Sequence, residues 1–390
     1  MSVRAAYGMF YNGMLPQGNE LSSLHNNIPF RPVNLAVGGA NTPIFASDII
    51  QPPVPNDIAL FPKEYPNPSL SPFVIDPSGV TPYVQQWNIG VEREFGPNLL
   101  IDLGYVGSHG IRLWGRGDPN QATQDVDLSN PTPIQSRRPF PWIGGTTYVR
   151  PGYQSWYNAF QAKVEKRYSK GFTFLGSFTW GMNLDEQSAT NSIQTTEYNQ
   201  RLDKGPSPND SRLRLVMSGI YEIPVGKGMQ FGSNFGPIPN ALLGHWQLNM
   251  ITKFQSGFAM DIQSSISSNQ GEAWNRPNRV CDGNLPKSKR TIDRFIDTSC
   301  FVAQPFGAIG DAGRDPVTGP GINNWDLSIF KAFAALPNER LRVEIRGEFF
   351  NAWNHTQFVG GTMTLPSPSF GFITSDMPGR EIQVGARLVF

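Results

Sequence analysis

The feature that most constrains the fold is an alternation of apolar and charged side chains with a period of two residues. In LRVEIRGEFF, residues 341–350, the apolar side chains are Leu341, Val343, Ile345 and Phe349, and the charged ones are Arg342, Glu344, Arg346 and Glu348. Successive side chains of a β-strand point to opposite faces, so this segment predicts a strand with one apolar and one charged face. The pattern alone does not say which face contacts water.

The same alternation recurs in pairs of segments joined by tight turns. QQWNIGVEREF (85–95) and LLIDLGYVGS (99–108) form one pair, and segments 160–168 and 172–180 form another. Such pairs predict β-hairpins. Further alternating segments are 212–223, 245–255, 323–333, 380–390 and the opening stretch, and no helical periodicity of comparable strength is present. The sequence therefore predicts an all-β antiparallel fold of about ten strands, each near the 9–11 residues that cross a bilayer when tilted.

Short and long connections alternate along the chain. The turns after residues 95, 168 and 333 are short, and the one after 223 is moderate. The long connections, rich in Pro, Asn, Ser and Gly, lie near 12–82, 115–155, 184–211, 261–322 and 355–378. Because neighbouring antiparallel strands run in opposite directions, the long loops all fall at one end of the sheet. Short turns at one end and long loops at the other are typical of an outer-membrane β-barrel.

A secreted β-sandwich or propeller is the main alternative, because its strands also alternate. Aromatic side chains near the segment ends favour the barrel, since a membrane girdle would place them there. They are Trp87, Tyr105, Tyr168, Trp180, Trp246 and Trp325. The shared side of the long loops and a final strand that ends in Phe390 point the same way. In a transmembrane barrel the apolar faces contact lipid and the charged faces line a wet lumen.

Composition excludes several classes of protein. The net charge is +1 and no basic run is present, so nucleic-acid binding is not expected. No window approaches the roughly 18 uninterrupted apolar residues of a membrane helix, and the mean hydropathy is −0.32. The opening MSVRAAYGMFYN lacks the features of a signal peptide and reads as a strand.

Nothing in the sequence points to catalysis. The four histidines are scattered, without the spacing of a metal site. The VGSHG segment at 106–110 resembles a nucleophile elbow, but Val106 stands where the first glycine belongs. No phosphate loop or dinucleotide fingerprint is present. We therefore expect no enzyme activity, no catalytic residue, no metal and no cofactor.

The two cysteines, Cys281 and Cys300, both fall in the long loop near 261–322. In the oxidising cell envelope we expect a disulfide between them, with free thiols as the alternative. The chain-entropy model assigns a bond of this ring size about 3 kcal/mol of stabilisation.

Two sets of side chains are candidates for contact with a transported molecule. The first would line the lumen, either as a ligand path or simply as a polar wall: Asp102, Lys163, Glu165, Arg167, Arg342, Glu344, Arg346 and Glu348. The second is a set of loop aromatics that could stack on a sugar or peptide, or merely pack the loops together: Trp142, Tyr148, Trp156 and Trp274.

Several phrases resemble the C-terminal barrel of Oar-like TonB-dependent outer-membrane receptors. They are TPYVQQWNIGVEREFGPNLLIDLGYVGSHG, YNAFQAKVEKRYSKGFTFLGSFTW, GPGINNWDLSIFK, RVEIRGEFFNAWNHTQF and the terminal strand. That strand also resembles the assembly signal of bacterial outer-membrane proteins, through Ile382, Val384, Ala386, Leu388 and Phe390. The resemblance covers nearly the whole chain. It implies a barrel of about 22 strands, an N-terminal plug and substrate uptake powered through TonB.

The sequence itself shows no plug, TonB-contacting segment or signal peptide. We therefore expect one partial barrel domain, residues 1–390, that forms the C-terminal portion of a longer transporter in the bacterial outer membrane. Its expected partners are outer-membrane lipid, the barrel assembly machinery and an unknown extracellular ligand, with TonB reached only through the missing N-terminal region. The alternatives are an adhesion or structural envelope barrel, and a small porin of about ten strands that closes alone.

Overall fold

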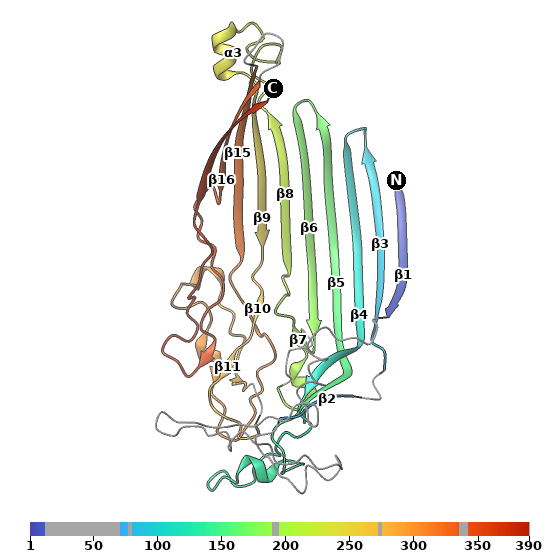
Figure 1. The fold of residues 1–390 in the computed structure, drawn as a ribbon, viewed down its shortest axis with the longest axis vertical. Coiled ribbons are helices and arrows are strands. Elements are labelled where there is room, and N and C mark those ends of the chain that lie inside the picture. Colours follow the sequence, from blue (N-terminus) through green and yellow to red (C-terminus); the bar gives the residue numbers. More distant parts are fainter. Residues whose placement is uncertain (12–70, 77–79, 189–194, 272–274, 335–341, 390) are drawn as a thin grey trace, which may run out of the picture.

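The structure, a computed structural model, describes residues 1–11, 71–76, 80–188, 195–271, 275–334 and 342–389. Its main element is an antiparallel sheet whose adjacent strands follow the order β1, β3, β4, β5, β6, β8, β9, β15, β16, β18 (Figure 1). Their bounds are β1 (Ser2–Tyr11), β3 (Tyr83–Phe95), β4 (Leu99–Gly117), β5 (Thr147–Ser169), β6 (Phe172–Asp185), β8 (Leu213–Glu222), β9 (Trp246–Gln255), β15 (Ile322–Ala334), β16 (Arg342–Phe350) and β18 (Glu381–Val389). The predicted all-β antiparallel fold is confirmed.

The remaining strands are short and lie beyond one end of the main sheet. β2 (Phe73–Ile75) pairs with β5, and β7 (Gly205–Pro206) pairs with β6. Three two-stranded sheets lie in the loops: β10 (Ala259–Met260) with β14 (Val317–Thr318), β11 (Gln263–Ser264) with β17 (Thr364–Leu365), and β12 (Asn278–Arg279) with β13 (Phe301–Val302).

The helical elements are also short. They are the 3₁₀ turns η2 (Ile134–Arg137), η3 (Gln200–Asp203), η4 (Lys287–Lys289) and η5 (Thr298–Cys300), and the α-helix α3 (Pro237–Leu243). None of the helices among the described residues has the length and apolar character needed to cross a membrane.

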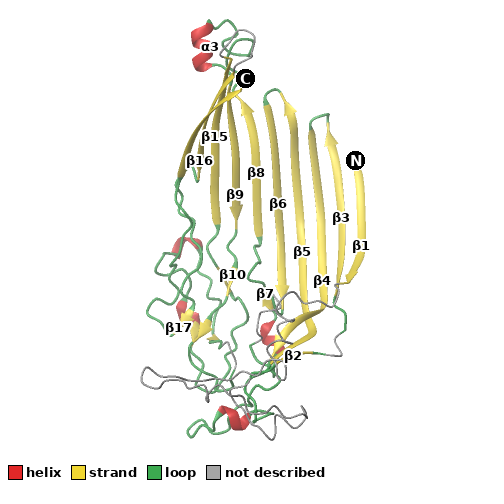
Figure 2. Cartoon of the chain, viewed as in Figure 1, coloured by secondary structure: helices red, strands yellow, loops and turns green. Residues whose placement is uncertain are grey.

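Short and long connections fall at opposite ends of the sheet (Figures 1 and 2). The turn from β5 to β6 places Lys170 at φ 53° and Gly171 at φ 76°, and that from β3 to β4 places Gly96 at φ 68°. Left-handed residues of this kind fit tight hairpin turns. The connection from β8 to β9 contains α3, a helix that the sequence pattern did not predict. The connection from β15 to β16 lies outside the described residues.

The pairing register sorts the side chains onto two unlike faces. One row across five strands consists of Val3, Val91, Leu103, Ala162 and Phe178. The adjacent row, one residue along each strand, contains Glu92, Asp102, Lys163 and Ser177 and points to the other face. The sheet therefore has an apolar face and a polar face.

The apolar face is open. Exposed fractions are 59% for Val3, 43% for Leu103, 61% for Trp180 and 80% for Val384. In a β-sandwich these side chains would form the buried core. Their exposure favours a sheet whose apolar face is covered by lipid.

Buried apolar side chains gather instead among the long loops. The main cluster consists of Ile262, Phe295, Ile296, Cys300, Phe301, Val317, Met363, Leu365 and Ile373. These residues come from the connections between β9 and β15 and between β16 and β18. The long-loop end therefore has a hydrophobic core of its own.

Two strands are longer than the sequence predicted. β4 and β5 extend past the rest of the sheet, so the loop between them covers 118–146 rather than 115–155. Glycines interrupt the apolar–polar alternation in the extended part of β4. They are needed because large side chains lie close to them: a Cβ at Gly107 would lie 2.3 Å from the Trp87 ring, and one at Gly115 would lie 2.3 Å from the Tyr153 ring. The VGSHG segment lies inside β4, paired on both sides.

The sheet is not closed within the described part of the chain. β1 and β18 lie at its two edges and each has one neighbour, β3 and β16 respectively. Figure 1 shows these edge strands at opposite sides of a curved wall.

Candidate functional site

A cavity of about 460 Å³ lies between three of the long loops. Its walls include Thr123 from the β4–β5 loop, Tyr198 and Asn199 from the β6–β8 loop, and Gln270 and Asp311 from the β9–β15 loop. Hydroxyl and amide groups can both donate and accept hydrogen bonds, and a tyrosine ring adds an apolar surface. The cavity therefore offers a few hydrogen-bonding groups among apolar surface that includes Leu202 and Ile309, a lining suited to reversible binding of a molecule with both polar and apolar parts.

One buried glutamine orders the wall that carries Tyr198. The Gln121 side chain is 2% exposed, and its Oε1 accepts a 2.6 Å hydrogen bond from the Glu197 N–H. The Tyr198 hydroxyl donates to the Gln121 carbonyl oxygen at 2.7 Å, although 53% of Tyr198 is exposed. Burial raises the pKa of Tyr198, so its hydroxyl stays a neutral donor. The ring is thus fixed at its tip and open along its face.

Behind this wall, a buried ion pair joins two of the loops. The Arg276 Nη2 atom lies 3.1 Å from the Asp203 Oδ1 atom, and Arg276 Nε donates to Thr195 Oγ1 at 2.8 Å. The Thr195 N–H donates to Asp203 Oδ2 at 3.0 Å. Burial raises the pKa of Asp203, whereas the hydrogen bonds from Thr195 and the positive charge of Arg276 lower it. The network holds the β9–β15 loop against the β6–β8 loop.

A second buried pair ties the loops to the sheet. Arg314 Nη1 lies 2.7 Å from Asp185 Oδ1 at the end of β6, and Arg314 Nε lies 3.3 Å from Asp315 Oδ2. Burial, reinforced by the nearby charge of Asp261, raises the pKa of Asp315 to about 6. The loop end is therefore anchored by charge pairs as well as by its apolar core.

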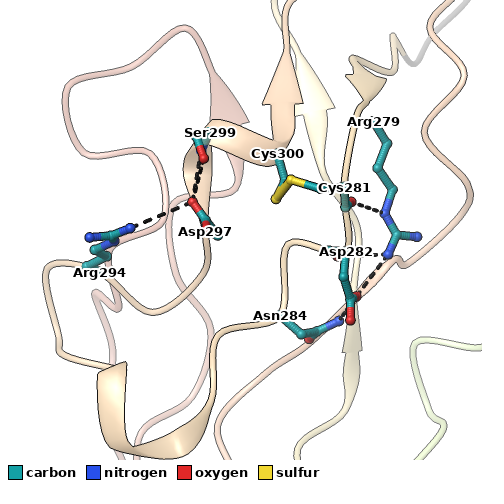
Figure 3. The surroundings of a disulfide bond; sticks show 8 residues. All are labelled: Arg279, Cys281, Asp282, Asn284, Arg294, Asp297, Ser299 and Cys300. Atoms are coloured by element: carbon teal, nitrogen blue, oxygen red, sulfur yellow. Dashed lines mark hydrogen bonds and ion pairs between the residues drawn. A yellow bond between two sulfur atoms is a disulfide. The ribbon is translucent and has the colours of Figure 1, made fainter.

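A disulfide between Cys281 and Cys300 cross-links the β9–β15 loop (Figure 3). The Val280 N–H donates to the Cys300 carbonyl oxygen at 2.9 Å, next to the pairing of β12 with β13. Next to the disulfide, Arg279 Nε donates to the Cys281 carbonyl oxygen at 2.8 Å, and Arg279 Nη2 lies 3.0 Å from Asp282 Oδ1. Cys300 is 3% exposed and belongs to the apolar core of the loops.

Three of the loop aromatics predicted from the sequence, Trp142, Tyr148 and Trp156, are not among the residues that line the cavity. Trp142 lies in the β4–β5 loop, with its ring centroid 5.8 Å from that of Phe140. Tyr148 and Trp156 lie in β5 rather than in a loop, so the prediction of their position was wrong. Trp156 stacks on His109 at 5.3 Å and lies 3.9 Å from the Lys204 Nζ atom. Trp274 lies outside the described residues.

The sequence reasoning missed Tyr198 and Asn199, which do line the cavity. Its one available signal was a tyrosine within the polar segment TTEYNQ of a long loop. The position of Tyr198 in the cavity wall is fixed by the hydrogen bond from its hydroxyl to the carbonyl oxygen of Gln121, a residue 77 positions earlier. No local pattern reveals such a contact.

A second cavity, of about 380 Å³, opens on the polar face of β9, β15, β16 and β18. Glu344, Arg346 and Glu348 line it, as do Asn249 and Ser328 of the adjacent strands. The Arg346 Nε and Glu348 Oε2 atoms are 3.8 Å apart. The structure does not describe the side chain of Arg342.

The other charged candidates lie on the same polar face in β4 and β5. Asp102 is directly opposite Lys163, whose Nζ atom lies 2.9 Å from Glu165 Oε2. Arg167 reaches Glu94 of β3 at 3.1 Å. These pairs are partly exposed, and pairs of this kind contribute about 0–1 kcal/mol. Their placement in a lumen stays a prediction.

The terminal strand keeps its predicted pattern. Ile382, Val384, Ala386 and Leu388 lie opposite Phe349, Gly347, Ile345 and Val343 of β16, on the apolar face. Phe390 lies outside the described residues. Across the described ranges, no group of three or more His, Cys, Asp or Glu side chains is arranged to hold a metal ion.

Comparison with solved structures finds proteins of the outer membrane. The outer membrane transporter YddB from Escherichia coli has a TM-score of 0.46 and 9% identity, with 82% of this chain and 34% of that chain covered. The ferripyoverdine receptor from Pseudomonas aeruginosa, bound to ferripyoverdine, has a TM-score of 0.36 and 12% identity, with 78% and 27% covered. The chain thus spans about a third or less of the length of these structures. No curated protein matches the sequence.

A family model gives the wider assignment. The model described as an outer membrane beta barrel domain matches residues 1–383, nearly the entire sequence. This family accounts for the two unlike faces of the sheet, because lipid covers one side of such a wall and water wets the other. The chain therefore belongs to the outer membrane beta-barrel domain family and lies in the bacterial outer membrane.

Proposed function

We propose that this chain forms the C-terminal part of the barrel of an Oar-like TonB-dependent outer-membrane receptor. The long-loop end binds a substrate from outside the cell, and the barrel admits it without covalent chemistry. The proposal rests on the position of the cavity of about 460 Å³. It lies between the long loops, at one end of a sheet whose apolar face is exposed. The Oar-like and TonB-dependent parts are supported by the sequence phrases alone.

The binding function is supported by how the cavity is braced. A disulfide, two buried ion pairs and an apolar cluster hold the surrounding loops. A ligand that enters a pre-formed cavity orders few side chains, so less conformational entropy opposes binding. Tyr198 and Asn199 offer a ring face and an amide to such a ligand.

Transport is supported by the polar face of the sheet. Charges of opposite sign lie beside one another there, as in Lys163 with Glu165 and Arg346 with Glu348. A polar surface of this kind suits the wet interior of a large barrel. The edges of the sheet, β1 and β18, would leave backbone groups unpaired in hydrocarbon. We therefore expect further strands to complete the wall, to about 22 in total as the resemblance implies.

The size of the native polypeptide tests this proposal. An antibody raised against the chain, used on outer-membrane fractions, should detect a band far above 43.2 kDa. Cross-linking in intact cells should also join that band to TonB. A band near 43.2 kDa that conducts ions in a planar bilayer would replace the proposal with a small porin. A band of that size without conductance would favour an adhesion or structural barrel.

A further inference from the structure

Helix α3 lies at the short-turn end of the sheet (Figures 1 and 2), and its apolar side chains are exposed. Ile238 is 74% exposed, Leu242 is 65% exposed and Leu243 is 58% exposed. Ile238 and Leu242 are four residues apart, so they lie on the same side of the helix. The opposite side is polar: the Asn240 Oδ1 atom accepts a 2.6 Å hydrogen bond from the Lys227 N–H. The helix therefore turns its apolar side away from the protein.

Two side chains attach α3 to the apolar face of the sheet rather than to the polar one. Trp246 of β9 and Lys331 of β15 are directly opposite each other, in line with the apolar pair Leu248 and Ile329. Trp246 Nε1 donates to the Leu242 carbonyl oxygen at 2.9 Å. Lys331 Nζ lies 3.5 Å from the Asn240 carbonyl oxygen and also donates to that of Gly244. The C-terminal end of the helix is thus fixed beside the apolar face.

The environment of Lys331 explains why a helix is placed here. An ammonium group on the lipid-facing side of a barrel is costly. Lys331 is 2% exposed, and the carbonyl groups at the end of α3 carry partial negative charge that stabilises it. The rings of Trp246 and Phe333 lie 5.1 Å and 5.0 Å from its Nζ atom. The cation and the helix end therefore shield each other from hydrocarbon.

We propose that α3 lies in the lipid interface of the periplasmic leaflet, with Ile238 and Leu242 inserted among the acyl chains. The short-turn end of an outer-membrane barrel is periplasmic. The helix is continuous with the apolar face that lipid covers, and an interfacial helix sinks its apolar side about 5–10 Å into the boundary between headgroups and acyl chains. The occupant of this surface is therefore phospholipid. The inference rests on the barrel family and not on TonB dependence.

Fluorescence quenching in membranes tests the proposal. The full-length native protein, as Leu242→Cys labelled with the environment-sensitive dye NBD, is placed in phosphatidylethanolamine and phosphatidylglycerol vesicles. Ser233→Cys is the matched control, because Ser233 is an exposed polar residue of the same connection. We expect the label at 242 to emit at shorter wavelength and to be quenched severalfold more by lipids with a nitroxide at acyl carbon 5 than by aqueous iodide. The label at 233 should show the reverse.

Two outcomes would overturn the proposal. Equal iodide quenching at 242 and 233 would show that α3 faces water. Protection of the label at 242 from both quenchers would show that a protein, or a second copy of the chain, covers the helix. Heat-modifiable migration on a gel establishes that each labelled variant is folded.

A second variant tests the role assigned to Lys331. Lys331→Ala removes the cation that contacts the carbonyl groups of Asn240 and Gly244. In the same vesicles, lipid quenching at position 242 should fall severalfold because the helix end is released. Unchanged quenching would overturn the assignment of Lys331 as the residue that fixes α3.

Discussion

Apolar side chains are exposed on the sheet of this molecule but buried at its long-loop end. On the sheet, Trp180 and Val384 are 61% and 80% exposed. Among the loops, Ile262, Ile296 and Val317 are each 1% exposed, within a core braced by a disulfide. The loop end is therefore built as a small globular domain is built, by burying its own apolar surface. The sheet needs a bilayer to cover its apolar face.

This difference separates what holds each region together. Mutations in the loop end should act through protein contacts and be felt with or without lipid. Mutations on the sheet should depend on the face that they change. Four substitutions or conditions test this contrast.

The largest effect is expected at the buried ion pair of the loops. Arg276→Met leaves the Asp203 carboxylate buried without its cation, and breaking such a pair costs about 3–5 kcal/mol. Hydrogen exchange should show loss of protection in residues 195–203 and unchanged protection in β8. Arg294→Met is the control, because Arg294 is 63% exposed and lies 3.7 Å from its partner Asp297. Equal losses in the two variants would contradict a buried pair.

The next effect concerns the lipid-facing side of the sheet. Leu103→Arg places a charge on the apolar face of β4, which costs about 2–4 kcal/mol near the middle of a bilayer. Gln161→Arg on the adjacent strand, which lies opposite Gly104 on the polar face, should change stability little. Urea unfolding of both variants in lipid vesicles measures the difference. Similar costs at the two positions would argue against one lipid face and one wet face.

A third effect is a pH dependence confined to the loop end. The pKa of Asp315 is about 6 in the folded loop, above the ordinary value of 3.8, so the folded state holds its proton more tightly than the unfolded state. The free energy of unfolding should therefore rise as the pH falls from above 6 towards 4. Asp315→Asn should reduce this rise, and asparagine tolerates the φ of 45° at this position. Thermal unfolding of the loop end at several pH values measures it; an identical slope in the two proteins would refute the assignment.

The smallest effect is expected on the polar face. Lys163→Ala removes a pair with Glu165 in which the lysine is 45% exposed, and such pairs are worth less than about 1 kcal/mol. Urea unfolding in vesicles should show a change within that range, smaller still at high salt. A cost of several kcal/mol would mean that the pair is shielded from water, which would contradict a water-filled lumen beside it.

The parts of the fold that the sequence predicts are those in which local chemistry repeats. The alternation is clear in residues 87–92 of β3 and 342–346 of β16, so the two faces of these strands follow from the side chains alone. The extension of β4 is hidden because Gly107 and Gly115 remove side chains where neighbouring rings need space. α3 has seven residues, two of them prolines, which is too short for a helical period to show.

The candidate site was less predictable because its contacts are distant in sequence. Arg276 and Asp203 are 73 residues apart, and each lies in a loop without a repeating pattern. The cysteines were an exception, because two thiols in one loop of an envelope protein have few other partners. Charged residues of the strands could be assigned to a face, but not to a lumen, because the same pattern fits any sheet with one wet face.

A scan of single spin labels along β4, residues 99–105, in vesicles of the native protein tests most directly whether one face of the sheet contacts lipid and the other water. Power saturation compares access of oxygen, which concentrates in lipid, with access of a water-soluble nickel chelate. For a membrane barrel wall we expect a two-residue alternation, with labels at Ile101, Leu103 and Tyr105 favouring oxygen and those at Asp102 and Gly104 favouring nickel. Uniform access along the strand, or the opposite phase, would contradict a membrane barrel wall with its apolar face in lipid.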